Sequence, residues 1–255
     1  MFSRFFGRKK RESEEEDNSN AVRDYSFLGA DMHSHFIPGI DDGAQTIDDS
    51  ITMLKAMQDM GYKSVVTTPH INFDHYPNSS SKILAGLQQV HHTLKEKDMD
   101  ITVKAAAEYY IDDHFFQILE REPLLTIYQD QVLVEISMAS QPSNLFEIMF
   151  NIQLKGYKPI LAHPERYLYL RENRQIFTDL KDRGCMLQLN TLSLAGYYGG
   201  DVKDMALFIL ENKLYDYAGT DMHHMKHAEL LQRFTQGKTF LKLQKYAFRN
   251  KDLMP

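Results

Sequence analysis

Residues 31–43 read DMHSHFIPGIDDG and follow a short apolar run over residues 26–32. His33 and His35 are separated by one residue, so both imidazoles project to the same side of an extended chain. Two nitrogens placed in this way can share one metal ion. An isolated pair of this kind is more often a surface pair or a hydrogen-bonded core pair, so its meaning depends on what the rest of the chain places beside it.

The chain behind this stretch alternates between short apolar runs and helical patterns. Further strands are expected at residues 63–68, 101–106, 131–136, 158–162, 185–189 and 215–220. Apolar side chains at helical spacing predict helices at residues 46–61, 83–94, 112–121, 145–156, 176–184 and 202–209. About seven β-α units with short connections predict a parallel sheet, either closed as a barrel or open and doubly wound.

Ligand-type side chains gather at the C-terminal ends of the predicted strands. They are His33, His35, His70, Glu108, Glu135, His163, Asp221 and His223, with Glu165 and Arg166 beside His163. In a parallel barrel the strand ends meet on one face, where active sites lie. Open sheets also place ligands outside the carboxyl ends of strands, but only a barrel brings the first and last strands to one point. We therefore expect a single-domain α/β barrel.

This cluster predicts more than one metal ion, because so many imidazoles and carboxylates exceed what one ion can bind. Carboxylates gathered away from water repel one another, and two or three divalent ions would relieve that repulsion. Simpler alternatives exist for single residues: Glu135 could be an ion-paired structural residue, and His70 could shape a loop. The remaining histidines lack this placement; His75, His91, His92, His114 and His227 are expected at the surface, and the direction of His224 is left open.

Composition excludes several classes of protein. The chain has 255 residues, 43% hydrophobic and 25% charged, which predicts a folded core. A net charge of −6 counts against electrostatic binding of nucleic acid. No apolar stretch approaches the roughly 20 residues of a transmembrane helix, and the N-terminus lacks a secretory signal, so we expect a cytoplasmic protein. Cys185 is the single cysteine, which excludes a disulfide framework, and we expect it in the core.

Residues 1–24 differ in composition from the rest of the chain. Phenylalanines alternate with basic residues over residues 2–11, and an acidic run over residues 14–17 follows. We expect a flexible tail over residues 1–24 ahead of one domain over residues 25–255. Aromatic residues beside a basic cluster would also suit a peripheral contact with an anionic membrane or a partner, although the acidic run weakens that attraction.

Six motifs together resemble the polymerase-and-histidinol-phosphatase (PHP) superfamily. They are DMHSHFIPGIDDG (31–43), TTPH (67–70), AAEYY (106–110), VEIS (134–137), AHPER (162–166) and TDMH (220–223). Their order and spacing resemble in particular the bacterial metal-dependent tyrosine phosphatases of capsule and exopolysaccharide loci, of the CpsB/YwqE type. The resemblance implies a PHP-type distorted (β/α)7 barrel with a trinuclear metal site.

The resemblance also implies a set of ligands for each ion. One ion takes His33, His35, Glu108 and Asp221; a second takes Glu135, His163 and the bridging Glu108; the third takes Asp42, His70 and His223. The choice of Asp42 rests on the resemblance alone, because residues 41–43 also fit an ordinary turn. Mixed imidazole and carboxylate ligands suit Mn, Fe, Co or Zn, and metal availability decides among them. We expect two or three ions, with Mn as the first choice.

The implied reaction is hydrolysis of protein phosphotyrosine by a metal-activated water. Arg166 fits a clamp on the phosphate, since a guanidinium pairs bidentately with phosphate oxygens; the alternative is a salt bridge with a carboxylate such as Glu165. The apparent relatives carry a second arginine where Ala228 stands, and Lys226 or His227 could replace it. A cysteine mechanism needs an arginine six residues after the cysteine, and that residue is Thr191.

The implied substrate is a membrane-associated bacterial tyrosine autokinase that controls exopolysaccharide or capsule synthesis. A small-molecule phosphatase of the histidinol-phosphate type is the first alternative, but the AHPER and VEIS motifs favour the tyrosine phosphatases. A metal-stabilised binding module without turnover is the second, and the complete ligand set counts against it. A polymerase-associated proofreading domain is the third, and the sequence shows no polymerase region.

Overall fold

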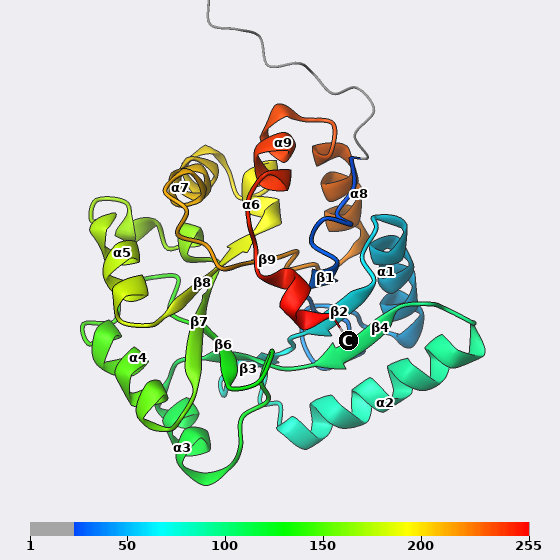
Figure 1. Cartoon of the computed structure of the whole chain (residues 1–255). Helices are drawn as coiled ribbons and strands as arrows, with labels where there is room; N and C mark the ends of the chain where they lie inside the picture. The colour runs from blue at the N-terminus through cyan, green and yellow to red at the C-terminus, as the bar shows by residue number, and fades with distance from the viewer. Residues whose placement is uncertain (1–22, 255) are drawn as a thin grey trace, which may run out of the picture.

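The strands of the protein form a curled sheet in which every ladder between named strands is parallel. The structure is a computed structural model that describes residues 23–254 (Figure 1). One group of hydrogen-bonded strands contains β1 (Ala30–Asp31), β2 (Ser64–Thr67) and β4 (Thr102–Ala105). The other contains β3 (His70–Ile71), β5 (Glu108–Tyr110), β6 (Gln131–Glu135), β7 (Lys158–Ala162), β8 (Met186–Asn190) and β9 (Tyr217–Gly219).

These nine segments make seven strands, because two strands are each interrupted once. The second strand consists of β2 and β3 and breaks at Pro69, which has no backbone N–H to donate to a ladder. The third consists of β4 and β5 and breaks at residues 106–107. The last strand returns to the first through a parallel bridge between Ser34 and Met222. The predicted distorted (β/α)7 barrel is therefore confirmed.

The first strand is shorter than expected. The sequence predicts a strand over residues 26–32, but only Ala30–Asp31 pairs in a ladder. Gly29 has φ +74°, in the left-handed region, and its carbonyl accepts hydrogen bonds from the N–H groups of Lys63 and Ser64. The chain turns at this glycine, so residues 26–28 do not join the ladder with β2.

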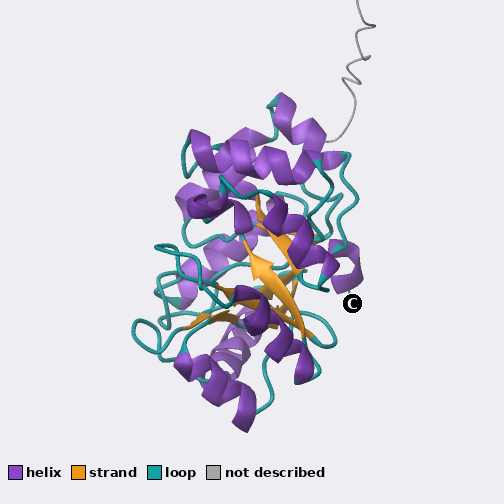
Figure 2. Cartoon of the chain, turned by 90° about the vertical axis from the view of Figure 1, so that its left-hand side faces the viewer, coloured by secondary structure: helices purple, strands orange, loops and turns teal. Residues whose placement is uncertain are grey.

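Helices surround the strands on the outside, as Figures 1 and 2 show. The predicted helices are present as α1 (Ile47–Asp59), α2 (Ser80–Glu96), α3 (Asp113–Arg121), α4 (Leu145–Leu154), α5 (Gln175–Asp182) and α7 (Gly200–Glu211). The sequence did not predict α6 (Thr191–Ala195), α8 (Met225–Phe234), α9 (Lys238–Gln244) or the 3₁₀ helices η1 (Pro164–Arg166), η2 (Leu168–Leu170) and η3 (Asn250–Leu253). At the start of α1, Thr46 and Asp49 form the capping box that the sequence predicts.

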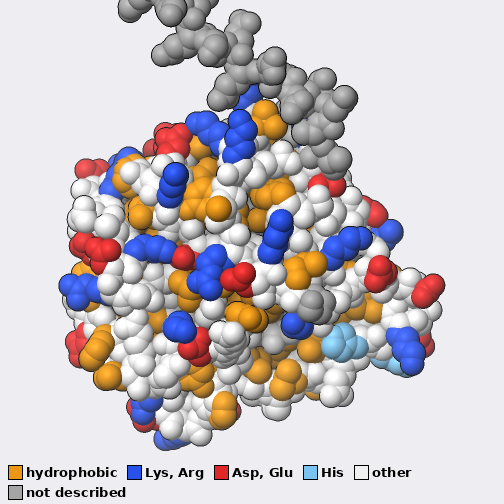
Figure 3. Space-filling model, in the orientation of Figure 1, with side chains coloured by type: hydrophobic (Ala, Val, Ile, Leu, Met, Phe, Trp, Pro, Cys, Tyr) orange, Lys and Arg blue, Asp and Glu red, His pale blue; other side chains and the backbone are white. Residues whose placement is uncertain are grey.

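Two apolar cores position the site. The larger one fills the space between the sheet and the helices. The smaller one fills the barrel interior with side chains such as Val66, Leu133 and Ile160, and Leu253 of η3 packs against it. Figure 1 shows η3 in the middle of the ring of helices, and Figure 3 shows that the same face carries charges of both signs interspersed with apolar side chains. No helix within residues 23–254 is long and apolar enough to cross a membrane.

The predicted tail lies outside the described residues except for its last two. Arg23 donates a hydrogen bond from Nη1 to the carbonyl oxygen of Gln236, at 3.4 Å. The carboxylate of Asp24 accepts the backbone N–H of Ser26 at 3.0 Å. The first of these contacts places Arg23 next to the C-terminal end of α8, and the second is local to residues 24–26.

Candidate metal centre

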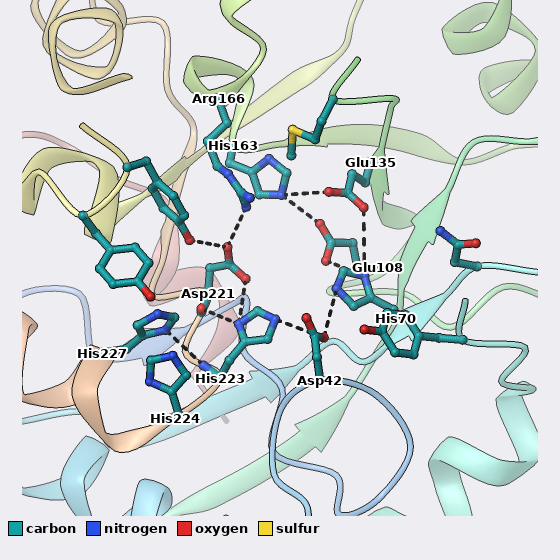
Figure 4. Close-up of a pocket in the computed structure, with 15 residues that line it drawn as sticks. Asp42, His70, Glu108, Glu135, His163, Arg166, Asp221, His223, His224 and His227 are labelled. Atoms are coloured by element: carbon teal, nitrogen blue, oxygen red, sulfur yellow. Dashed lines mark hydrogen bonds and ion pairs between the residues drawn. The ribbon is translucent and has the colours of Figure 1, made fainter. Parts of the chain in front are cut away.

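A pocket of about 400 Å³ opens at the carboxyl ends of the strands (Figure 4). Arg166 and seven of the nine predicted ligands line it: Asp42, His70, Glu108, Glu135, His163, Asp221 and His223. The other two, His33 and His35, are completely buried and contact the pocket residues from below. The structure thus brings all nine predicted ligands together, from strands that are far apart in the sequence.

The first predicted ligand set has the spacing of neighbouring ligands around one ion. The Nε2 atoms of His33 and His35 lie 3.4 Å apart. Oε2 of Glu108 lies 3.1 Å from the first nitrogen and 3.6 Å from the second, and Oδ1 of Asp221 lies 3.3 and 3.4 Å from them. Bonds of about 2.0–2.2 Å to one ion place adjacent ligands roughly 3.0–3.6 Å apart.

Glu108 presents its two carboxylate oxygens to different imidazoles. Oε2 faces His33 and His35, whereas Oε1 lies 3.1 Å from Nε2 of His163. That same nitrogen lies 3.6 Å from Oε1 of Glu135, so the second predicted set is also assembled. A carboxylate divided in this way has the arrangement of a bridging ligand.

The third predicted set lies nearer the solvent. Oδ1 of Asp42 is 3.7 Å from Nε2 of His70 and 3.4 Å from Nε2 of His223, and about half of the Asp42 side chain is exposed. Ligand atoms of these three residues and of His35 lie within 4.8 Å of one another. His35 therefore stands between the first and third sets rather than within the first alone.

The cluster is electrostatically unusual because imidazoles and carboxylates are buried together. Burial and the negative charge of Glu108 raise the pKa of Glu135 well above its usual value. Burial would lower the pKa of His33, but Glu108 and Asp221 raise it to about 9. Burial and the charge of Arg166 lower the pKa of His163 to about 4. Without bound ions, the negative charge of the buried carboxylates is thus offset by protons held on groups such as His33 and Glu135.

The donor set fits divalent cations. Imidazole nitrogens and carboxylate oxygens are ligands for Mn, Fe, Co and Zn, and positive ions would supply the charge that the protons otherwise provide. Nδ1 of His163 is buried without a hydrogen-bond partner, while its Nε2 faces the two glutamates. Nε2 is therefore the ring nitrogen that faces the cluster.

The backbone at the site departs from its usual conformations. His163 and Asp221 have φ values of +33° and +51°, although neither is glycine. Such left-handed residues cost free energy and cluster at functional sites. Gly219 permits a close approach, because a Cβ atom there would lie 2.6 Å from Cβ of His33. The surrounding fold therefore sustains local strain to hold the ligands together.

Arg166 pairs with Asp221 rather than with Glu165. Its Nη1 donates to Oδ2 of Asp221 at 3.1 Å, and its guanidinium lies 4.3 Å from the ring centroid of Tyr198. Glu165 is completely buried and accepts hydrogen bonds from the Tyr215 hydroxyl and the Asn190 N–H, both at 2.9 Å. The alternative of a salt bridge with Glu165 is therefore not what forms: the pairing carboxylate is Asp221. Arg166 also lines the pocket, so the predicted phosphate clamp remains a prediction.

The prediction for one histidine, His227, was wrong. His227 is expected at the surface, but it is buried and lines the pocket, because it lies on the inner face of α8 beside Ala228. His224 also lines the pocket, whereas Lys226 is exposed and does not. Burial and the neighbouring His224 lower the pKa of His227 to about 3, so it is neutral. Neither Lys226 nor His227 provides a second cation to the pocket.

Further residues at the site were not found from the sequence. Asp41 and Gln188 contact the rings of His35 and His33, and Asn190 and Tyr198 contact Asp221. Only the resemblance distinguished Asp42 from Asp41, and an isolated buried Gln or Asn gives no sequence signal. Cys185 is buried as expected, and burial raises the pKa of its thiol to about 12, so it does not supply a thiolate.

Comparison with known proteins identifies a family. The family described as "Capsular polysaccharide synthesis, CpsB/CapC" matches residues 29–235. The tyrosine-protein phosphatase YwqE of Bacillus subtilis is 32% identical over 197 residues, which are 77% of this chain and 78% of that protein. The tyrosine-protein phosphatase CpsB of Streptococcus pneumoniae is 29% identical over 201 residues, covering 76% of this chain and 83% of that protein.

Solved structures agree with this comparison. A chain from the crystal structures of YwqE and CpsB, described there as unique metal-dependent tyrosine phosphatases, matches with a TM-score of 0.73 and 28% identity. The match covers 83% of this chain and 90% of that one. The lactonase Lmo2620 of Listeria monocytogenes matches with a TM-score of 0.53 at 12% identity, over 89% of this chain and 91% of that one, which shows a shared fold alone.

Proposed function

The chain belongs to the CpsB/CapC family of capsular polysaccharide synthesis, and from that premise we propose that it is a metal-dependent protein-tyrosine phosphatase. Its relatives YwqE and CpsB are named tyrosine-protein phosphatases. The observation that carries the proposal is the division of the Glu108 carboxylate between the imidazoles of His33 and His35 on one oxygen and that of His163 on the other. The complete ligand set counts against a metal-stabilised binding module without turnover.

We propose that each ligand set holds one divalent ion. His33, His35, Glu108 and Asp221 would hold the first ion, Glu108, Glu135 and His163 the second, and Asp42, His70 and His223 the third. Ions bound there would supply the Lewis acidity that activates a water and neutralises the phosphoryl oxygens. Mn is the proposed metal, and the ligand chemistry also accepts Fe, Co or Zn.

The protein's own residues would orient the substrate. Arg166 reaches the pocket with a guanidinium that Asp221 and the Tyr198 ring hold in place. A guanidinium fixed in this way can donate to a phosphate from its remaining N–H groups. A phenolate is a stable leaving group, so phosphotyrosine requires less help from a general acid than an alkyl phosphate does.

The proposed substrate is a phosphotyrosine protein of polysaccharide synthesis, and a membrane-associated bacterial tyrosine autokinase is the proposed partner. The family to which the chain belongs supports the pathway, and the two named phosphatases support the chemistry. A cytoplasmic location would suit such a partner. We also propose residues 1–24, with their aromatic and basic side chains, as a peripheral contact near that membrane.

The test compares two substrates under controlled metal. Chelator-treated protein should hydrolyse neither substrate, and Mn²⁺ should restore hydrolysis of a phosphotyrosine peptide far more than that of histidinol phosphate. Elemental analysis of the restored protein should find two or three ions per chain. Preference for histidinol phosphate would replace the proposal with a small-molecule phosphatase, and undiminished activity after chelation would contradict metal dependence.

A further inference from the structure

Asp41 lies directly behind one imidazole of the H-x-H pair. Its Oδ2 is 2.9 Å from Nδ1 of His35, and neither side chain has exposed surface. A carboxylate at this distance accepts a hydrogen bond, so Nδ1 of His35 carries the proton. The other ring nitrogen, Nε2, then has its lone pair available on the side of Glu108 and Asp221.

Gln188, from β8, has the same relation to the other imidazole. Its Oε1 lies 2.9 Å from Nδ1 of His33, and it is completely buried. The orientation of the amide is determined, because Oε1 also accepts the backbone N–H of His163 at 3.2 Å and Nε2 donates to the carbonyl of Leu189. Nδ1 of His33 must therefore be the donor, and Nε2 is the nitrogen that faces Glu108 and Asp221.

Each of these two side chains also contacts a ligand residue from another strand. Oδ2 of Asp41 accepts the backbone N–H of His70 at 3.2 Å, so Asp41 links the first ligand set to the third. Gln188 contacts the backbone of His163 and links the first set to the second. Oδ1 of Asp41 further accepts the N–H of Gly43 at 3.0 Å, which fixes the carboxylate in its loop.

We propose that Asp41 and Gln188 are positioning residues that hold His33 and His35 as Nε2 ligands and connect them to the neighbouring ligand sets. This inference rests on the proposed function, since it concerns the same metal centre. Neither residue reaches the pocket, so their action passes through the imidazoles. Loss of such an outer partner of a ligating histidine typically lowers metal affinity by about 10- to 100-fold.

The experiment measures Mn²⁺ affinity directly. Mn²⁺ alone is titrated into the metal-free full chain, and the electron paramagnetic resonance signal of free Mn²⁺ reports binding. Gln188→Met, which removes the acceptor at similar volume, should lower affinity for at least one ion by about 10- to 100-fold. Gln188→Glu retains an acceptor oxygen and should retain most of the affinity. Asp41→Asn removes the charge and fixed acceptor and should weaken binding.

Matched controls lie away from the pocket. Gln131 is a buried glutamine whose Oε1 accepts the hydroxyl of Tyr217 at 2.7 Å, and Asp216 is a carboxylate that accepts the N–H of Leu187 at 2.9 Å. Gln131→Met and Asp216→Asn should leave Mn²⁺ affinity unchanged. Circular dichroism of each metal-free variant confirms that it is folded before its affinity is compared.

A reversed order of the two Gln188 variants would overturn the inference. If Gln188→Met binds like the wild type and Gln188→Glu does not, Gln188 only fills space. Equal losses in the control variants would also overturn it, because the effect would then be general destabilisation. The two proposals can fail separately. If the variants rank in Mn²⁺ affinity as expected but the wild type does not hydrolyse phosphotyrosine, the proposed function is contradicted and the positioning roles remain.

Discussion

The two ends of the barrel both bury polar side chains, but they satisfy them in different ways. At the N-terminal ends of the strands, the Tyr217 hydroxyl donates to Gln131 at 2.7 Å. Nδ2 of Asn250 donates to the carbonyls of Ala30 and Ala218, and its Oδ1 accepts the N–H of Ala218. These are neutral groups whose partners all belong to the protein.

At the C-terminal ends, the buried groups are imidazoles and carboxylates. Their charges balance only if protons are retained within the cluster, as the raised pKa values of His33 and Glu135 indicate. A buried neutral network is complete without any bound ion, whereas a buried ionic cluster depends on protons or cations. The comparison therefore agrees with a stabilising role for one end of the barrel, and the other end has the residue clusters that are able to hold metal ions.

The largest loss of metal binding and activity is expected on removing the Glu108 carboxylate, which faces His33 and His35 with one oxygen and His163 with the other. Glu108→Ala should lower the metal content and reduce kcat/KM on a phosphotyrosine peptide by more than about 100-fold, since even outer partners of ligands cost about 10- to 100-fold. Gln131→Met, at the opposite end, should retain activity. Full metal occupancy of Glu108→Ala in elemental analysis would refute the bridging role.

A smaller effect is expected at the rim of the pocket. A charged hydrogen bond to phosphate contributes roughly 1.5–3 kcal/mol, so Arg166→Ala should lower kcat/KM by about 10- to 150-fold. Arg166→Lys should recover part of this loss, because lysine lacks the bidentate fork. Lys226→Ala serves as the control and should change nothing, since Lys226 is exposed and does not line the pocket. Unchanged kcat/KM of Arg166→Ala with its metals in place would show that Arg166 is structural.

The dependence of stability on pH should distinguish the ion-free from the ion-bound centre. Burial would lower the pKa of His33, but Glu108 and Asp221 raise it from 6.5 to about 9, so its contribution to stability is present below pH 6.5 and lost as the pH rises through about 9. Burial raises the pKa of Asp31 and of Glu165 to about 7, and their contributions are also lost as the pH rises through that value.

The Tm of chelator-treated protein should therefore fall as the pH rises from about 6.5 to about 9. Mn²⁺ should stabilise the protein increasingly over the same range, because metal binding requires deprotonated ligands. Thermal unfolding with chelator and with Mn²⁺ measures both trends. A stabilisation by Mn²⁺ that decreases with pH would contradict ligation by these histidines.

The smallest effect on activity is expected from substitution of Cys185, the only cysteine in the sequence. Cys185→Ser should leave kcat/KM unchanged, because the thiol lies in the core between Met149 and the backbone of Met186. Burying a hydroxyl there should cost about 1–3 kcal/mol in the free energy of unfolding, which denaturant unfolding would measure. A folded variant without activity would contradict the metal-dependent mechanism.

The sequence predicted the ligand-type residues that follow the predicted strands. Six strand ends carrying ligand-type residues could be recognised because parallel strands bring their ends together, as His33, Glu135 and Asp221 show. The sequence analysis ended the second and third strands at residues 68 and 106. It therefore did not predict that they resume beyond Pro69 and beyond residues 106–107, as β3 and β5.

Residues that act through other residues could not be predicted. Gln188 belongs to a buried strand and Asp41 to a turn, and only the fold shows that each faces an imidazole. His227 was placed at the surface because the sequence gave no prediction of α8. With that helix present, its spacing from Leu231 puts both side chains on the buried face. Long-range contacts, rather than local pattern, determine these positions.

Anomalous diffraction from crystals grown with Mn²⁺ tests the central claim most directly. We predict at least two manganese peaks that share Glu108 as a ligand, one also bound by His33 and His35 and the other by Glu135 and His163. The N-terminal end of the barrel, around Gln131 and Tyr217, should show none. Peaks confined to surface carboxylates, with no ion in contact with Glu108, would contradict the account.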